Sequence, residues 1–218
     1  MMTKTEDPRP KANEVNDVSA IILAAGRSQR MGAFKPLLPF GPTTVIETCI
    51  ENLRASGIKS IVVVLCQDSR GEDLREHLRN AGVTFAFNPD SNSEMSASIA
   101  CGVCNLPEVT RAVIINPVDH AAVPGEVVET LISEWQKGAR LVKPTWNGRG
   151  GHPVLIDLDF RDELLSLDPD GGLKAFFGVH QAEVSRIPVV SNYIARDMDT
   201  WDDYRALHTE VFGVPPLK

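Results

Sequence analysis

The sequence contains few cysteines, and it lacks both a long apolar run and an apolar leader. Only four of its 218 residues are cysteines, too few for the disulfide framework of a small secreted domain. No apolar run approaches the roughly 18 to 20 residues that span a bilayer, and residues 1–17 lack the apolar centre of a signal peptide. We therefore expect a cytoplasmic protein with reduced thiols and no membrane partner.

Basic residues are also scarce. The chain has 22 lysines and arginines against 29 aspartates and glutamates, a formal net charge of −7. Binding of nucleic acid needs a basic face that replaces the counterions of the phosphates. We therefore expect no nucleic-acid partner, and any anionic ligand must be met by cations that are concentrated locally.

The length and the 43% share of hydrophobic residues fit one globular domain with a sizeable core. Residues 1–17 are charged, contain proline and have no hydrophobic periodicity, which is typical of a mobile tail. The rest of the chain holds no repeat, linker or low-complexity block. The sequence predicts a mobile amino-terminal tail over 1–17 and a single domain over 18–218.

The order of the apolar segments predicts the fold class. Residues 18–24 are almost continuously apolar, as in a strand that is covered on both faces. Further strands are predicted at 61–65, 83–87, 112–116, 141–145, 152–156 and 184–190, and helices at 44–56, 71–81, 96–104, 125–137 and from about 201. Because strand and helix alternate, we expect an α/β fold with three α/β/α layers, Rossmann-like, around a mostly parallel mixed sheet.

Ligands of such sheets bind at the carboxyl ends of the strands. The loop after the first predicted strand carries three cations, Arg27, Arg30 and Lys35, together with Gly26 and Gly32. It has neither the dinucleotide fingerprint G-x-G-x-x-G nor the spacing of a P-loop. Glycine amides and several cations nevertheless suit a polyphosphate. The alternative is a solvated loop whose cations pair with surface carboxylates.

The stretch from Ala20 to Leu38 also resembles a known signature. It reads AIILAAGRSQRMGAFKPLL and resembles the nucleotidyltransferases that share the GT-A type fold. Four later segments resemble the molybdenum cofactor cytidylyltransferases within that group: EMSASIACG, PVDH, GHP and DMDT. Two departures concern the ligands: Glu94 stands where that branch has glycine, and Ala121 and Ala122 replace a proline. The resemblance covers residues 20 to about 207.

The resemblance implies transfer of a nucleoside monophosphate, CMP from CTP in the first place, to a phosphate-bearing acceptor such as molybdopterin, with release of pyrophosphate. It implies a nucleotide site made by Leu23, Ala24, Ala25, Gly26, Arg27 and Ser28. Met95, Ser96 and Ser98 would line the base and ribose. For Ser96, a plain helix N-cap is an equal alternative.

The same resemblance implies the catalytic groups. Arg30 and Lys35 would stabilise charge in the transition state, and Asp119 would coordinate Mg²⁺, with Asp199 as the second carboxylate. Each aspartate also has a structural alternative. Asp119 could form a turn or cap the helix predicted from 125, and Asp199 could cap the terminal helix or exchange roles with Asp197.

His152 and Pro153 lie in a glycine-rich turn and would form a wall of the acceptor pocket. His120 could do the same, or be an ordinary polar loop residue. Cys101 and Cys104 are spaced by three on a predicted helix, which favours packing over a redox or zinc role.

Two other functions stay open at this point. The first keeps the fold with another pair of substrates, as in a guanylyltransferase or an NTP:phosphosugar or phosphoalcohol nucleotidyltransferase. The second is a non-catalytic nucleotide-binding protein that delivers cofactor to a molybdoenzyme or its maturation chaperone.

Overall fold

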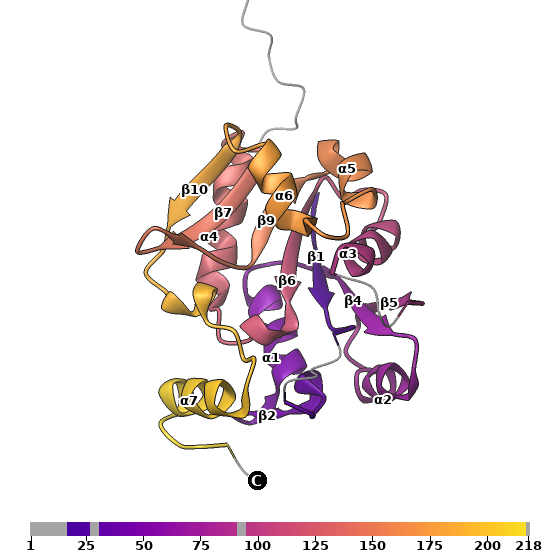
Figure 1. Cartoon of the computed structure of the whole chain (residues 1–218), viewed down its shortest axis with the longest axis vertical. Coiled ribbons are helices and arrows are strands. Elements are labelled where there is room, and N and C mark those ends of the chain that lie inside the picture. Colours follow the sequence, from indigo (N-terminus) through magenta and orange to yellow (C-terminus); the bar gives the residue numbers. More distant parts are fainter. Residues whose placement is uncertain (1–16, 27–30, 91–94, 217–218) are drawn as a thin grey trace, which may run out of the picture.

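The computed structural model describes residues 17–26, 31–90 and 95–216, and a mostly parallel sheet forms its centre. The strands follow the order β10-β7-β9-β6-β1-β4-β5, with β8 paired to β7 (Figure 1). Their bounds are β1 Val18–Leu23, β4 Ser60–Cys66, β5 Thr84–Asn88, β6 Ala112–Pro117, β7 Leu141–Trp146, β8 Arg149–Gly150, β9 Val154–Asp157 and β10 Val184–Pro188. Since β9 is antiparallel to both β6 and β7, the strands β6 and β7 run in the same direction.

The central strand β1 pairs in parallel with β4 and with β6, so Ile21 lies opposite both Val62 and Ile115. Side chains alternate between the faces of a strand. Ala20 and Ile22 accordingly join one core cluster, and Ile21 and Leu23 the other. The β-branched residues of these strands are buried on both faces, as the apolar runs predicted.

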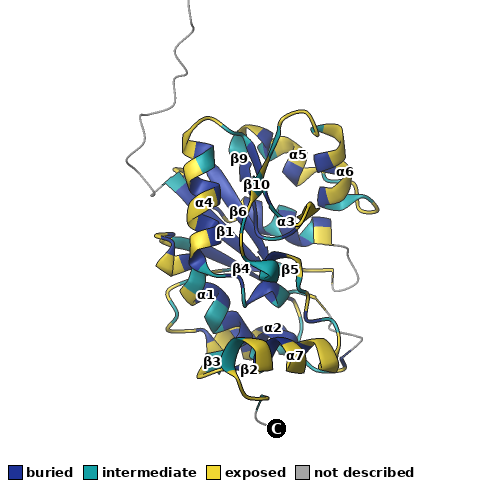
Figure 2. Ribbon diagram, turned by 90° about the vertical axis from the view of Figure 1, so that its left-hand side faces the viewer, coloured by how far each residue is buried: buried dark blue, intermediate teal, exposed yellow. Residues whose placement is uncertain are grey.

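Helices cover both faces of the sheet, and Figure 2 shows the buried strands between them. The first core cluster receives apolar residues from α1, α2, α4 and α7, and the second from α3, α5 and α6. Their bounds are α1 Val45–Ala55, α2 Ser69–His77, α3 Met95–Cys104, α4 Gly125–Gln136, α5 Arg161–Leu165, α6 Gly172–Val179 and α7 Trp201–Phe212. The predicted three-layer α/β/α architecture is confirmed.

Helix α1 illustrates how the local sequence specifies an element. The hydroxyl of Thr44 accepts a hydrogen bond from the amide of Glu47, while the Glu47 carboxylate accepts one from the amide of Thr44. This capping box satisfies backbone donors at the start of the helix. The apolar residues at helical spacing, Val45, Ile46, Cys49, Ile50 and Leu53, are all buried.

Several short elements were not predicted. A small hairpin, β2 Pro39–Phe40 and β3 Thr43–Thr44, joins the first loop to α1. Four 3₁₀ turns, η2 Lys35–Leu37, η3 Val118–His120, η4 Leu158–Phe160 and η5 Asn192–Ala195, lie between larger elements. Segments of two to four residues are too short to produce a hydrophobic period.

The division into a tail over 1–17 and one domain over 18–218 stays a prediction, because residues 1–16 lie outside the described part. Within the part that the structure describes, none of the helices has the length and apolar character needed to cross a bilayer.

Candidate functional site

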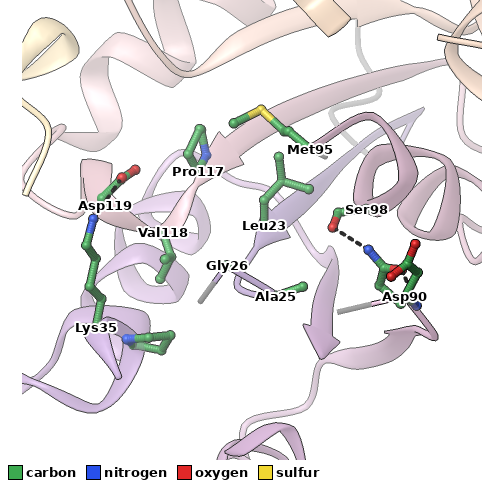
Figure 3. A pocket seen from close by; sticks show the side chains of 12 residues that line it. Leu23, Ala25, Gly26, Lys35, Asp90, Met95, Ser98, Pro117, Val118 and Asp119 are labelled. Carbon is green, nitrogen blue, oxygen red and sulfur yellow. Dashed lines mark hydrogen bonds and ion pairs between the residues drawn. The ribbon is translucent and has the colours of Figure 1, made fainter. Parts of the chain in front are cut away.

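A pocket of about 210 Å³ opens at the carboxyl ends of β1, β5 and β6. Figure 3 shows Lys35 and Asp119 pointing toward one another at one end of the pocket. Ser98 and Asp90 lie at the other end. The lining residues are Leu23, Ala25, Gly26, Lys35, Pro36, Asn88, Asp90, Met95, Ser98, Pro117, Val118 and Asp119. The pocket therefore lies at the sheet edge where the sequence predicted a ligand.

One end of this pocket combines a buried ammonium with two carboxylates. Lys35 begins the short turn η2 and is only 8% exposed. Its Nζ lies 3.0 Å from Oδ1 of Asp199, which immediately precedes the N-cap of α7, and 3.6 Å from Oδ2 of Asp119, in η3. Three separate parts of the chain thus place their charges around one small volume.

The capping alternatives for the two aspartates are wrong. Pro124 is the N-cap of α4 and has no side-chain cap, so Asp119 does not cap that helix. Thr200 is the N-cap of α7 and forms a capping box with Asp203, so Asp199 does not cap that helix. Both carboxylates instead approach Lys35.

The other end of the pocket presents hydrogen-bonding side chains. Asn88, at the end of β5, donates from Nδ2 to the hydroxyl of Ser98 at 2.9 Å. The side-chain Oδ1 of Asn88 accepts from the backbone amide of Asp90 at 3.1 Å. Asn88 and Asp90 were not predicted as site residues, and their only signal in the sequence is their position after a strand.

The predicted nucleotide residues are only partly in the pocket. Leu23, Ala25, Gly26, Met95 and Ser98 line it, and Met95 is 47% exposed. Two other predicted residues, Ala24 and Ser96, are not among its lining residues. The Ala24 amide donates to the Val64 carbonyl, which extends the sheet, and Ser96 is buried in the first turn of α3 rather than preceding it.

Four residues that the sequence motifs place at the site lie outside the described residues. They are Arg27, Ser28 and Arg30 of the first loop, and Glu94 before α3. Of the three cations predicted to bind phosphate, Lys35 is therefore the one whose place in the structure is described, and the roles of Arg27 and Arg30 stay predictions.

Next to Asp119, two histidines lie close together. Their ring centroids are 5.2 Å apart, and Nε2 of His120 lies 3.1 Å from Oδ1 of Asp197. His120 is 5% exposed, so it is not an ordinary polar loop residue. Burial, assisted by the charges of His120 and Lys143, lowers the pKa of His152 to about 3. His152 is therefore neutral at physiological pH.

His152 and Pro153 are not among the residues that line the pocket. The amide of His152 donates to the Ile194 carbonyl at 2.9 Å, and Pro153 is buried. Their predicted role at the acceptor is therefore a role beside this pocket rather than within it. Asp197 and Asp199 have different partners, because Asp197 pairs with His120 and Asp199 with Lys35.

The packing prediction for the cysteine pair is only half right. Cys101 is partly buried and contacts the second core cluster, whereas Cys104 is exposed. The last turn of α3 leaves the second sulfur at the surface. Among the described residues, no group of three or more His, Cys, Asp or Glu side chains could hold a metal ion.

Comparison with known proteins agrees with the family resemblance of the sequence motifs. The profile of the MobA-like NTP transferase domain matches residues 20–184. The molybdenum cofactor cytidylyltransferase of Escherichia coli is 28% identical over 141 residues, which are 64% of this chain and 69% of that protein. The nicotine blue oxidoreductase of Paenarthrobacter nicotinovorans is 26% identical over 200 residues, 87% of this chain and 96% of that protein.

Solved structures share the fold at low sequence identity. A nucleotidyl transferase from Methanothermobacter superposes with a TM-score of 0.77 at 20% identity, covering 91% of this chain and 99% of that one. Rv0371c from Mycobacterium tuberculosis, in complex with manganese, gives 0.76 at 22% identity, covering 89% and 100%. These likenesses establish the GT-A type nucleotidyltransferase fold of the sheet and its helices.

Proposed function

Because the chain belongs to the MobA-like NTP transferase family, we propose that it transfers CMP from CTP to a phosphate-bearing acceptor of the molybdopterin type and releases pyrophosphate. The observation that carries the proposal is the placement of Lys35 between Asp119 and Asp199 at one end of the pocket. The choice of CTP and of the acceptor is supported by the likeness to the Escherichia coli cytidylyltransferase.

The reaction needs no covalent nucleophile from the protein. The acceptor phosphate attacks the α-phosphorus of the NTP, a new P–O bond forms, and the bond to the pyrophosphate leaving group breaks. Such a transfer depends on in-line positioning and on neutralisation of charge on the phosphate oxygens. Lys35 would donate to an α-phosphate oxygen, and Arg30 would do the same from the first loop.

The pair of carboxylates fits a divalent cation. Asp119 and Asp199 already share one cation, the Lys35 ammonium, and their oxygens are the ligand type that Mg²⁺ prefers. A site with two protein carboxylates suits Mg²⁺, which keeps waters and substrate phosphates as its other ligands. When bound, the ion would neutralise phosphate charge and align the reacting groups. The manganese in the structure of Rv0371c supports a divalent metal in this fold.

The rest of the nucleotide would extend toward the far end of the pocket. Ala25 and Gly26 offer backbone close to the phosphates, and Ser98 and Asn88 offer hydrogen-bonding groups to the ribose and base. Arg27 and Ser28 complete the predicted phosphate contacts. The partly exposed thioether of Met95 would cover one face of the base.

The acceptor would bind on the side of β7 and β9. His152 is neutral and partly buried, so it would shape or bind the acceptor with Pro153 rather than act as a general base. An acceptor phosphate is largely ionised at neutral pH and needs no base to attack.

A second candidate is a redox reaction, because the nicotine blue oxidoreductase aligns over almost its whole length. The triad of Lys35, Asp119 and Asp199 favours phosphoryl chemistry, since a hydride transfer has no use for two carboxylates around a phosphate-binding lysine. An assay for oxidation of a reduced nicotinamide cofactor therefore accompanies the main test.

The main test measures pyrophosphate release with CTP, GTP, ATP or UTP, molybdopterin and Mg²⁺. We expect turnover with CTP, and a loss of about 100-fold or more in kcat for Asp119→Asn. Asp73→Asn, at an exposed position of α2, is the matched control and should behave as wild type. Unchanged pyrophosphate release in Asp119→Asn would refute the mechanism, and cofactor oxidation without pyrophosphate would favour the redox candidate.

A further inference from the structure

Lys143, in the middle of β7, is a partly buried cation that the proposed reaction does not yet use. Its Nζ lies 5.4 Å from the centre of the Phe177 ring in α6. This helix packs on the face of the sheet that forms the second core cluster (Figure 1). The stem of Lys143 passes beside Gly150, where an added Cβ would lie only 2.5 Å from Cε. The side chain therefore occupies space that any larger residue at position 150 would take.

The charge of Lys143 has no counterion among the described residues. It forms none of their ion pairs, whereas Lys35 pairs with Asp119 and Asp199. The charged group that acts on it is another cation, Arg186, which lies opposite it in the register of β10 and β7. Burial and this neighbour both lower the pKa of Lys143. A partly desolvated cation beside a like charge is unfavourable unless an anion binds there.

The position of Lys143 relates it to the reaction site. β7 and β6 run in the same direction, so Gly150 and the end of β7 lie at the edge where Asp119 follows β6. The charge of Lys143 also reaches His152, since it contributes to the lowered pKa of that imidazole. Lys143 therefore lies on the acceptor side of the site.

We propose that Lys143 and Arg186 form a second anion subsite, which binds an anionic group of the acceptor remote from its attacking phosphate. The proposal rests on the proposed function. One strand, β9, separates β7 from β6, so the strands are about 10 Å apart. The attacking phosphate must lie near Asp119, and the group at Lys143 is therefore a different one. The acceptor then carries a second anionic group besides its attacking phosphate, unlike a small phosphoalcohol.

The first test uses inorganic sulfate as the probe, added at constant ionic strength after saturation with CTP and Mg²⁺. We expect a saturable rise in melting temperature in wild type that is lost in Lys143→Met and reduced in Arg186→Met. Lys174→Met, at an exposed position of α6, is the matched control and should keep the response. Equal responses of Lys143→Met and Lys174→Met would overturn the proposal.

Two further measurements separate this role from a structural one. Without ligand, Lys143→Met should melt at or above the wild-type temperature, because an uncompensated charge is removed; a lysine kept for packing would lose stability instead. Gly150→Ala should displace the lysine and weaken sulfate binding, whereas Gly178→Ala, where an added Cβ meets nothing within 4 Å, should not.

In the pyrophosphate assay with molybdopterin, Lys143→Met should raise the acceptor KM about tenfold with kcat little changed. The nucleotide-induced stabilisation should be the same in all these variants. If no nucleotide stabilises even the wild type, the proposed function fails, and the sulfate titration repeated without nucleotide still decides whether the subsite exists.

Discussion

At the scale of single residues, the described charges around Lys35 include a pair of carboxylates that suits a metal. Two carboxylates, Asp119 and Asp199, approach one ammonium, and the charge of Asp197 also acts from nearby, since Lys35 contributes to the lowered pKa of that carboxyl. The arriving phosphates would add negative charge beside these carboxylates. A divalent cation held by Asp119 and Asp199 would offset that charge.

The two aspartates of the DMDT segment should differ in their effect on metal use. Asp199→Asn should raise the Mg²⁺ concentration for half-maximal activity by at least about tenfold, because a ligand is lost. Asp197→Asn should change it much less, since the Asp197 carboxylate pairs with His120 instead. Magnesium titrations of pyrophosphate release compare the two variants, and a larger effect of Asp197→Asn would reverse the assignment.

His152 makes stability depend on pH. Its pKa is about 3 in the folded chain, lowered mainly by burial and then by His120 and Lys143, against an ordinary value of 6.5. The unfolded chain therefore binds a proton at this residue below pH 6.5 that the folded chain does not. The free energy of unfolding should fall by about 2 kcal/mol between pH 7.5 and pH 5 through this group.

The test compares the pH slope of denaturant unfolding in wild type and His152→Gln. The absolute stability of the variant is not informative, because a buried side chain is changed. A slope that is as steep in His152→Gln as in wild type would show that another group causes the loss.

Among the site residues, the sequence predicted those that belong to a contiguous motif. Lys35, Asp119 and Gly26 could be named because they belong to segments that resemble the motifs of the nucleotidyltransferases. Asn88 could not, since its bond to Ser98 joins residues whose contact depends on the packing of β5 against α3. The burial of His120 was missed for the same reason.

At the scale of elements, the start of α7 positions one carboxylate of the site. Thr200 and Asp203 form a capping box, which fixes the chain immediately after Asp199. At the start of the helix, the indole of Trp201 donates to the carbonyl of Met31 at 2.9 Å, and the Tyr204 hydroxyl donates to the carbonyl of Pro39. The helix thus ties the second carboxylate to the segment that carries Lys35.

Removal of this cap should affect stability and catalysis together. Thr200→Ala should lower the free energy of unfolding by about 1 kcal/mol and also raise the Mg²⁺ requirement, because Asp199 loses its support. Thr44→Ala removes the same kind of capping box from α1 and should cost similar stability with unchanged magnesium dependence. Equal magnesium curves for both variants would mean that the cap does not position Asp199.

The longer elements could be predicted from the sequence, and the short connections could not. Strand β4 and helix α1 lie within one or two residues of their predicted bounds, because apolar period and capping residues specify them. The hairpin of β2 and β3 and the turns η2 and η3 depend on contacts distant in sequence. These short pieces nevertheless carry Lys35 and Asp119.

At the scale of the whole molecule, two parts of the sheet carry the residues that would bind the two substrates of the proposed reaction. The parallel strands β1, β4, β5 and β6 form the part with the pocket proposed for the nucleotide, and β9, β7 and β10 form the part with His152, Lys143 and Arg186. Asp119 follows β6, where the two parts meet. In the proposed reaction this arrangement would bring two substrates together at one sheet edge.

We infer that this edge binds a nucleoside triphosphate through Lys35 and a metal held by Asp119 and Asp199. The most direct measurement is the melting temperature with CTP, GTP, ATP or UTP, each with and without Mg²⁺, in wild type and Asp119→Asn. A nucleotide at about 100 times its Kd should stabilise the fold by about 2.7 kcal/mol. The account predicts the largest shift with CTP and Mg²⁺, and loss of the magnesium-dependent part in Asp119→Asn. No shift with any nucleotide, or an equal magnesium-dependent shift in Asp119→Asn, would contradict it.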